Sequence, residues 1–125
     1  AIAVRNFGIF LSSRFYTLKN NISIPVASSV SVSGTIQQNQ NITAAYTYSD
    51  VDGDTEGMSE IHVEYADDSS GTNRVSMQYH FSGESVQLIV TQLNKYIRVG
   101  VVPISSTGKV GKIVWSSWSG PVIAS

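Results

Sequence analysis

Apolar and polar residues alternate with a period of two along most of the chain after residue 25. In one such stretch, Ile61, Val63 and Tyr65 alternate with polar neighbours. This period predicts half-buried β-strands, because successive side chains of a strand point to opposite faces. Gly, Asn, Asp and Ser cluster between the stretches, as turns require, and strands so spaced are typical of a β-sandwich. We expect about seven short strands, over residues 26–36, 42–49, 61–65, 75–81, 86–90, 96–104 and 113–123.

The composition favours the same all-β class. Ile and Val together number 27 against 4 Leu, and Ser numbers 20. β-Branched side chains suit a pleated sheet and lose rotamer freedom in helices. A chain of 125 residues without cysteine suits one domain that folds without disulfides. No apolar run reaches the ~18 residues that indicate a transmembrane helix.

Residues 1–24 differ from the rest of the chain. They carry Arg5, Arg14 and Lys19, no acidic residue, and four aromatic residues. Their apolar positions fit a helix in part and a strand in part, so the pattern leaves both open. We expect a basic, aromatic N-terminal extension, either a linker or an element that packs on the sandwich or on a partner. The sandwich itself is expected over residues 25–125.

A tyrosine corner is predicted where the sixth strand begins. Tyr96 opens that strand, and Leu93 precedes it by three residues. In such a corner the phenol donates a hydrogen bond to the backbone upstream, which holds the crossover between the sheets. The alternative is an ordinary core tyrosine.

One segment resembles a known family of bacterial surface proteins. Residues 46–59 read Y-T-Y-S-D-V-D-G-D-T-E-G-M-S, and residues 96–103 read Y-I-R-V-G-V-V-P. Both are similar to the immunoglobulin-like repeats of adhesins and of invasin/intimin-type proteins, and the likeness covers residues 25–125. Val63 departs from the pattern, because the family has tryptophan near that position.

The resemblance implies an immunoglobulin-like β-sandwich with a non-enzymatic role. It implies adhesion or assembly in a secreted or cell-surface protein, and thus a virulence-associated function. The partner would be another immunoglobulin-like protein or an outer-membrane protein. One such arrangement is the secreted partner of a zinc-regulated, intimin-like export system.

Acidic residues are concentrated in one segment. Residues 50–68 carry a charge of −8, against +3 for residues 1–49 and +4 for residues 69–125, which sum to the net charge of −1. Such a density of like charge costs stability unless water, a cation or a basic partner offsets it. We expect a contact surface for a basic partner, formed by Asp50, Asp52, Asp54, Glu56, Glu60, Glu64, Asp67 and Asp68.

Three of these acids have the spacing of calcium ligands. Asp50, Asp52 and Asp54 occupy positions 1, 3 and 5 of an EF-hand-like loop, and hard oxygen ligands suit Ca²⁺. Thr55 and Ile61 stand where an EF-hand has glycine and glutamate, so that motif is excluded. A weak turn-type calcium site, a solvated Asp-Gly turn and a partner contact remain as alternatives.

A W-S-S-W-S run lies near the C-terminal end. Trp115 and Trp118 flank it, and Arg98 or Lys112 could stack on their indole rings. The run resembles the W-S-x-W-S signature of cytokine-receptor fibronectin-type modules. The alternative is one core tryptophan and one on a strand surface.

The chain contains no nucleophile, phosphate-loop or zinc-protease motif, so we expect no enzyme. A net charge near zero argues against a nucleic-acid binder. The preferred function is a bacterial protein-binding module that uses the acidic surface, a sheet edge, or both. The Ser-rich residues 26–34 are the candidate edge. A structural spacer in a long repeat array and a cytokine-receptor-like module are the alternatives.

Overall fold

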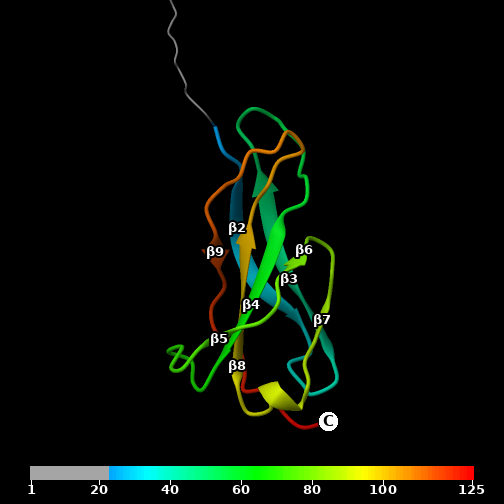
Figure 1. The fold of residues 1–125 in the computed structure, drawn as a ribbon, viewed down its shortest axis with the longest axis vertical. Helices are drawn as coiled ribbons and strands as arrows, with labels where there is room; N and C mark the ends of the chain where they lie inside the picture. The colour runs from blue at the N-terminus through cyan, green and yellow to red at the C-terminus, as the bar shows by residue number, and fades with distance from the viewer. Residues whose placement is uncertain (1–22) are drawn as a thin grey trace, which may run out of the picture.

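The computed structural model describes residues 23–125, which form two antiparallel β-sheets packed face to face (Figure 1). The predicted all-β sandwich is therefore confirmed. The extension predicted over residues 1–24 lies outside the described residues, apart from its last two positions. Within the described part, no helix has the length and apolar character that a membrane span needs.

The first sheet has three strands in the order β2-β3-β7, with bounds Val26–Gly34, Asn41–Ser49 and Val86–Gln87. β2 lies at its edge, as predicted for residues 26–34. The register of β2 on β3 shifts between Ser28 and Ser31, where Ser29 has a φ of 54°. This bulge bends the strand and interrupts its free edge.

The second sheet has five strands in the order β5-β4-β8-β9, with β6 also paired to β4. Its long strands β4 and β8 pair over seven residues each. The bounds are β4 Glu60–Ala66, β5 Val75–Ser76, β6 His80–Phe81, β8 Tyr96–Val102 and β9 Val114–Trp115. A short 3₁₀ helix, η2 (Val90–Gln92), leads into β8.

The core lies between the sheets and consists of the inward-facing members of each alternating strand. On β8, Ile97, Val99 and Val101 are each at most 1% exposed. Ile42 of the first sheet and Leu88 after β7 belong to the same cluster. The alternation read from the sequence places the correct side chains inside on β4 and β8, where period two and sheet pleat coincide. In the predicted strands 75–81 and 86–90 it fails at Val75, Tyr79 and Val90, which are exposed.

The last predicted strand is much shorter than its 113–123 pattern suggested. After Trp115, the hydroxyl of Ser116 accepts the hydrogen bond of the Val99 N–H at 3.0 Å, while the Ser116 N–H donates to the Val99 carbonyl. A side chain thus replaces a backbone carbonyl, and the regular ladder ends. Pro121 cannot donate further along, and only isolated bridges follow.

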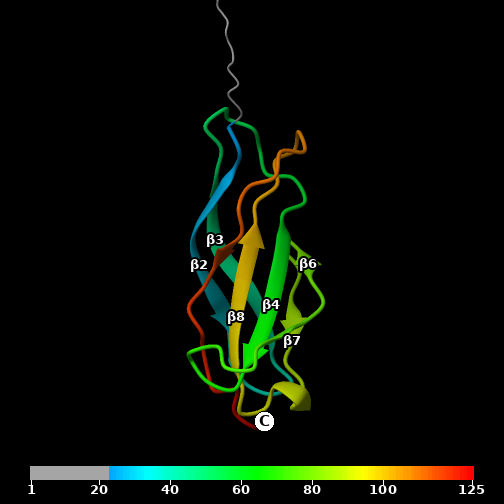
Figure 2. The same cartoon turned by 60° about the vertical axis from the view of Figure 1, so that its left-hand side comes forward.

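The described chain starts and finishes at opposite ends of the long axis (Figures 1 and 2). The first described residues enter β2 beside the β3–β4 loop. The C-terminal residues lie at the other end, near η2. The acidic segment 50–68 runs from the first end to the second, because β4 crosses the length of the sandwich.

Candidate functional site

Two loops meet at the end where the chain enters β2. They are residues 50–59 between β3 and β4, and residues 103–111 between β8 and β9. The Gly57 N–H donates to the Ile104 carbonyl at 2.7 Å, and the Ser106 N–H donates to the Thr55 carbonyl at 2.8 Å. A Cβ on Gly57 would lie 2.6 Å from a backbone oxygen of the second loop, so only glycine permits this approach. We call the two segments the loop pair.

The turn that starts the first loop brings three carboxylates together. The Asp52 N–H donates to Asp50 Oδ1 at 2.8 Å, and the Gly53 N–H donates to the Asp50 carbonyl at 3.0 Å. Gly53 adopts a φ of +80°, which glycine takes without strain. Carboxylate oxygens of Asp50, Asp52 and Asp54 lie within 4.8 Å of one another. The sequence spacing therefore does gather the three candidate calcium ligands.

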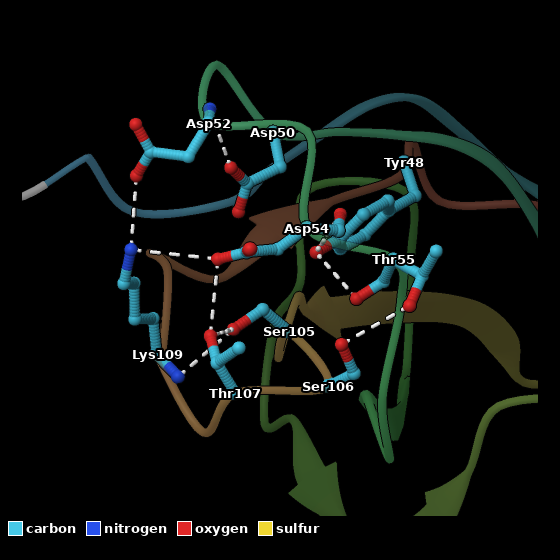
Figure 3. Close-up of polar contacts among 9 residues, drawn as sticks. All are labelled: Tyr48, Asp50, Asp52, Asp54, Thr55, Ser105, Ser106, Thr107 and Lys109. Carbon is cyan, nitrogen blue, oxygen red and sulfur yellow. Dashed lines mark hydrogen bonds and ion pairs between the residues drawn. The ribbon is translucent and has the colours of Figure 1, made fainter.

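Lys109 of the second loop faces two of these carboxylates (Figure 3). Its Nζ lies 2.9 Å from Asp52 Oδ2 and 3.4 Å from Asp54 Oδ2. The Thr107 hydroxyl donates a hydrogen bond to Asp54 Oδ2 at 3.0 Å. The hydrogen bond from Lys109 lowers the pKa of Asp52, and the pKa of Lys109 is raised by the same contact. A calcium ion at these oxygens would have to displace the ammonium group.

Asp50 contributes the least satisfied carboxylate of the loop pair. Its Oδ2 atom is buried and has no hydrogen-bond partner among the described residues. Next to it, Val51 is 89% exposed at the tip of the turn. Tyr48 packs behind the turn, where its hydroxyl donates to the Thr55 carbonyl at 3.3 Å. Desolvation and the neighbouring carboxylates raise the pKa of Tyr48.

The other five acids of the segment do not join this cluster. Three carboxylates pair along β4 or beside it: Glu56 accepts from the Tyr46 hydroxyl, Glu60 lies 3.0 Å from His62, and Glu64 lies 2.7 Å from Arg98. Two lie in the loop at the opposite end, where Asp67 contacts Lys95 at 2.5 Å and Asp68 accepts from the backbone of Ser70. Of the eight acids in residues 50–68, Asp50, Asp52 and Asp54 form one close cluster, and the others lie along the length of the molecule.

Arg98 stacks between the two tryptophans on the outer face of the second sheet. Its guanidinium carbon lies 4.0 Å from the ring centroid of Trp115 and 4.7 Å from that of Trp118. Gly100 makes room for the stack, since a Cβ there would lie 2.6 Å from the Trp115 ring. The stacking of Arg98 on the tryptophans that the sequence predicted is therefore present. Both tryptophans are half-buried, so the alternative of one tryptophan in the core and one on the surface is wrong. Lys112 lies elsewhere, beside β2.

Tyr96 and Leu93 lie at the predicted crossover, both half-buried. No hydrogen bond joins the Tyr96 hydroxyl to a described residue. Backbone bonds hold this part of the crossover instead: the Asn94 N–H donates to the Val122 carbonyl at 2.8 Å, and the Val122 N–H donates to the Lys95 carbonyl at 2.9 Å. The hydrogen bond of the tyrosine corner is thus replaced, within the described part, by contacts with the C-terminal segment.

Sequence reasoning missed the second loop, because nothing local marks Lys109 or Thr107 as partners of acids more than fifty residues away. The segregation of charge was the available signal. Eight acids without a neighbouring base indicate that bases from elsewhere in the fold lie beside some of them.

Comparisons of the chain with models of protein families, with curated proteins and with solved structures found no match.

Proposed function

We propose that this chain is a non-enzymatic protein-binding module of a secreted or cell-surface bacterial protein, and that the loop pair is its contact site. One observation carries the proposal. The loop pair is cross-linked by backbone and side-chain hydrogen bonds, yet it presents Val51 at 89% exposure beside the Asp52 carboxylate, whose side chain is 45% exposed.

This arrangement suits recognition for two physical reasons. A loop that is already ordered loses little conformational freedom on binding, so more of the contact energy appears as affinity. An exposed apolar side chain next to an exposed carboxylate favours a partner that offers an apolar pocket with a basic residue beside it. The charges would speed association and lose effect as salt rises.

The bacterial setting rests on the resemblance of residues 46–59 to the repeats of adhesins and invasin/intimin-type proteins. On that basis the partner is an immunoglobulin-like or outer-membrane protein, and adhesion or assembly is the role. In its most specific form, the proposal is that this chain is the secreted partner of an intimin-like, zinc-regulated export system.

The test compares two double variants for capture of proteins from bacterial outer-membrane extracts. Asp50→Asn/Val51→Ser alters the loop pair and leaves the Lys109 pairs in place. Asp67→Asn/Val75→Ser makes the same chemical change at the opposite end of the molecule. We expect the first to lose capture at least tenfold, by about 1.4 kcal/mol or more, and the second to retain it. Equal capture by both variants would reject the loop pair as the site.

A structural spacer is the second candidate function. The observation in its favour is that the described chain starts and finishes at opposite ends of the sandwich (Figure 2). Such modules can follow one another in a rod, with the loop pair facing the preceding module. In that case the Asp50→Asn/Val51→Ser variant would bind partners normally and would instead loosen the junction, which small-angle scattering of a longer chain would detect.

A further inference from the structure

The described residues begin at the loop pair. Ser23, the first of them, leads into β2 beside the β3–β4 loop (Figures 1 and 2). Hydrogen bonds from Lys109 and then from the Ser23 side chain lower the pKa of Asp52, so Ser23 lies next to the acidic turn. Residues 1–22 are therefore joined to the sandwich at the contact site itself.

The loop pair and residues 1–22 carry opposite charges. Residues 50–59 contain four acids and no base, and residues 103–111 contain one base and no acid, which leaves a net charge of −3. Residues 1–22 contain the three bases Arg5, Arg14 and Lys19 and no acid, which gives +3. The Asp52 side chain is 45% exposed even with Lys109 beside it, so a second cation can reach it. The charge of residues 1–22 therefore complements that of the loop pair.

Apolar side chains of the two parts are complementary as well. Val51, Met58 and Val110 of the loop pair are each more than half exposed. Phe15 and Tyr16 stand close to Ser23 in the sequence. Covering exposed aliphatic side chains with an aromatic ring is favourable in proportion to the apolar area removed from water. An apolar residue with a base nearby is also the chemistry that the proposed function assigns to the partner.

The chain is long enough for this contact. Phe15 precedes Ser23 by eight residues, which span at most about 26–29 Å when extended. Val51 adjoins Asp52 in the turn beside Ser23. A tethered segment of this kind has an effective concentration in the millimolar range, so a contact with a Kd of about 1 mM is occupied about half of the time. Weak contacts thus suffice to cover the loop pair.

We propose that residues 14–22 fold back over the loop pair of their own chain, with Lys19 beside Asp52 and the pair Phe15-Tyr16 against Val51. The segment thereby occupies the contact site until a partner of the same chemistry displaces it. This inference rests on the proposed function, because it assigns a regulation to the site that binds the partner.

The test measures how fast a thiol at position 51 reacts with an uncharged maleimide in the full chain. Since the chain has no cysteine, Val51→Cys introduces a single reporter thiol. Phe15→Ser/Tyr16→Ser in this background should speed the reaction about twofold, because it uncovers a site that is covered about half of the time. Lys19→Gln should also speed it, although the loss of a nearby cation by itself raises the pKa of a thiol and slows its reaction.

Two controls separate this contact from general effects. Phe7→Ser/Phe10→Ser makes the same chemical change outside residues 14–22 and should leave the rate at position 51 unchanged. Ser69→Cys places the thiol in the exposed loop at the opposite end of the molecule, where neither double variant should change the rate. In the capture assay, Phe15→Ser/Tyr16→Ser should retain about twofold more protein than the unchanged chain.

The proposal is overturned if Phe15→Ser/Tyr16→Ser neither speeds the reaction nor raises capture, or if Phe7→Ser/Phe10→Ser speeds the reaction equally. A faster reaction without greater capture overturns the regulation. Protection of position 51 that increases with protein concentration also overturns the proposal, since it would assign the segment to the loop pair of a second copy. The labelling needs no partner, so its failure is distinct from equal capture by the Asp50→Asn/Val51→Ser and Asp67→Asn/Val75→Ser variants, which rejects the proposed function.

Discussion

Replacing Arg98 by methionine should destabilise the domain more than removing any other ion-paired base among residues 23–125. The Arg98 side chain is 18% exposed and that of its partner Glu64 is 14% exposed, so the pair is largely shielded from water. Two guanidinium nitrogens contact the same Glu64 oxygen, at 2.9 and 2.7 Å. Arg98→Met keeps much of the aliphatic packing on the tryptophans but leaves the Glu64 carboxylate without its partner.

The expected loss follows from two contributions. Breaking one side of a buried pair costs about 3–5 kcal/mol, and partial exposure places this case at the lower end. Loss of two cation–π contacts adds about 0.5–2 kcal/mol. We therefore expect a loss of about 3.5–5 kcal/mol in the free energy of unfolding. For a domain of this size that is a fall of roughly 14–20 °C in Tm, at about 4 °C per kcal/mol.

The assay is urea denaturation and thermal melting of four chains: wild type, Arg98→Met, Arg98→Met/Glu64→Gln, and the control Lys95→Met. Arg98→Met/Glu64→Gln also removes the unpaired Glu64 charge, so it should recover about 1–2 kcal/mol of the lost free energy of unfolding. Lys95 pairs with Asp67 at the surface, at 36% and 41% exposure, and its loss should cost under about 1 kcal/mol. The reasoning is refuted if Arg98→Met costs no more than Lys95→Met, or if glutamine recovers nothing.

Three further outcomes are expected. Ser116→Ala removes the acceptor of the buried Val99 N–H and should cost about 1–3 kcal/mol in urea denaturation, whereas Ser117→Ala should cost little. The folded pKa of Asp52 is lowered, so its contribution is present above the unfolded pKa of about 4 and is lost as pH falls through the folded value. Asp52→Asn should therefore show a shallower loss of Tm below about pH 4. Lys109→Met leaves the loop carboxylates uncompensated, so its Tm should fall most at low ionic strength. Adding CaCl₂ should then raise the Tm of this variant more than NaCl of equal ionic strength, and EDTA should reverse the gain. An equal rise in Tm with both salts would reject the calcium site.

The fold could be predicted from local information wherever burial follows the period of the strand. Ile61 and Val63 on β4 are inside because the sheet pleat converts their spacing into one face. The same pattern overestimated the length of the strand predicted over residues 113–123. There Ser116 and Pro121 end the ladder through hydrogen bonding that apolar spacing does not encode.

The sequence by itself determined the class of fold, the inward faces of the strands, the gathering of Asp50, Asp52 and Asp54 in one turn, and the suitability of Arg98 for stacking. Each of these depends on residues that are close along the chain or on the chemistry of one side chain. Only the tertiary structure decided that Lys109 faces the acidic turn, that the remaining acids pair along the molecule, and that the chain enters β2 beside the loop pair. Those outcomes depend on which distant segments meet, and that choice is made by the packing of the two sheets around a shared core.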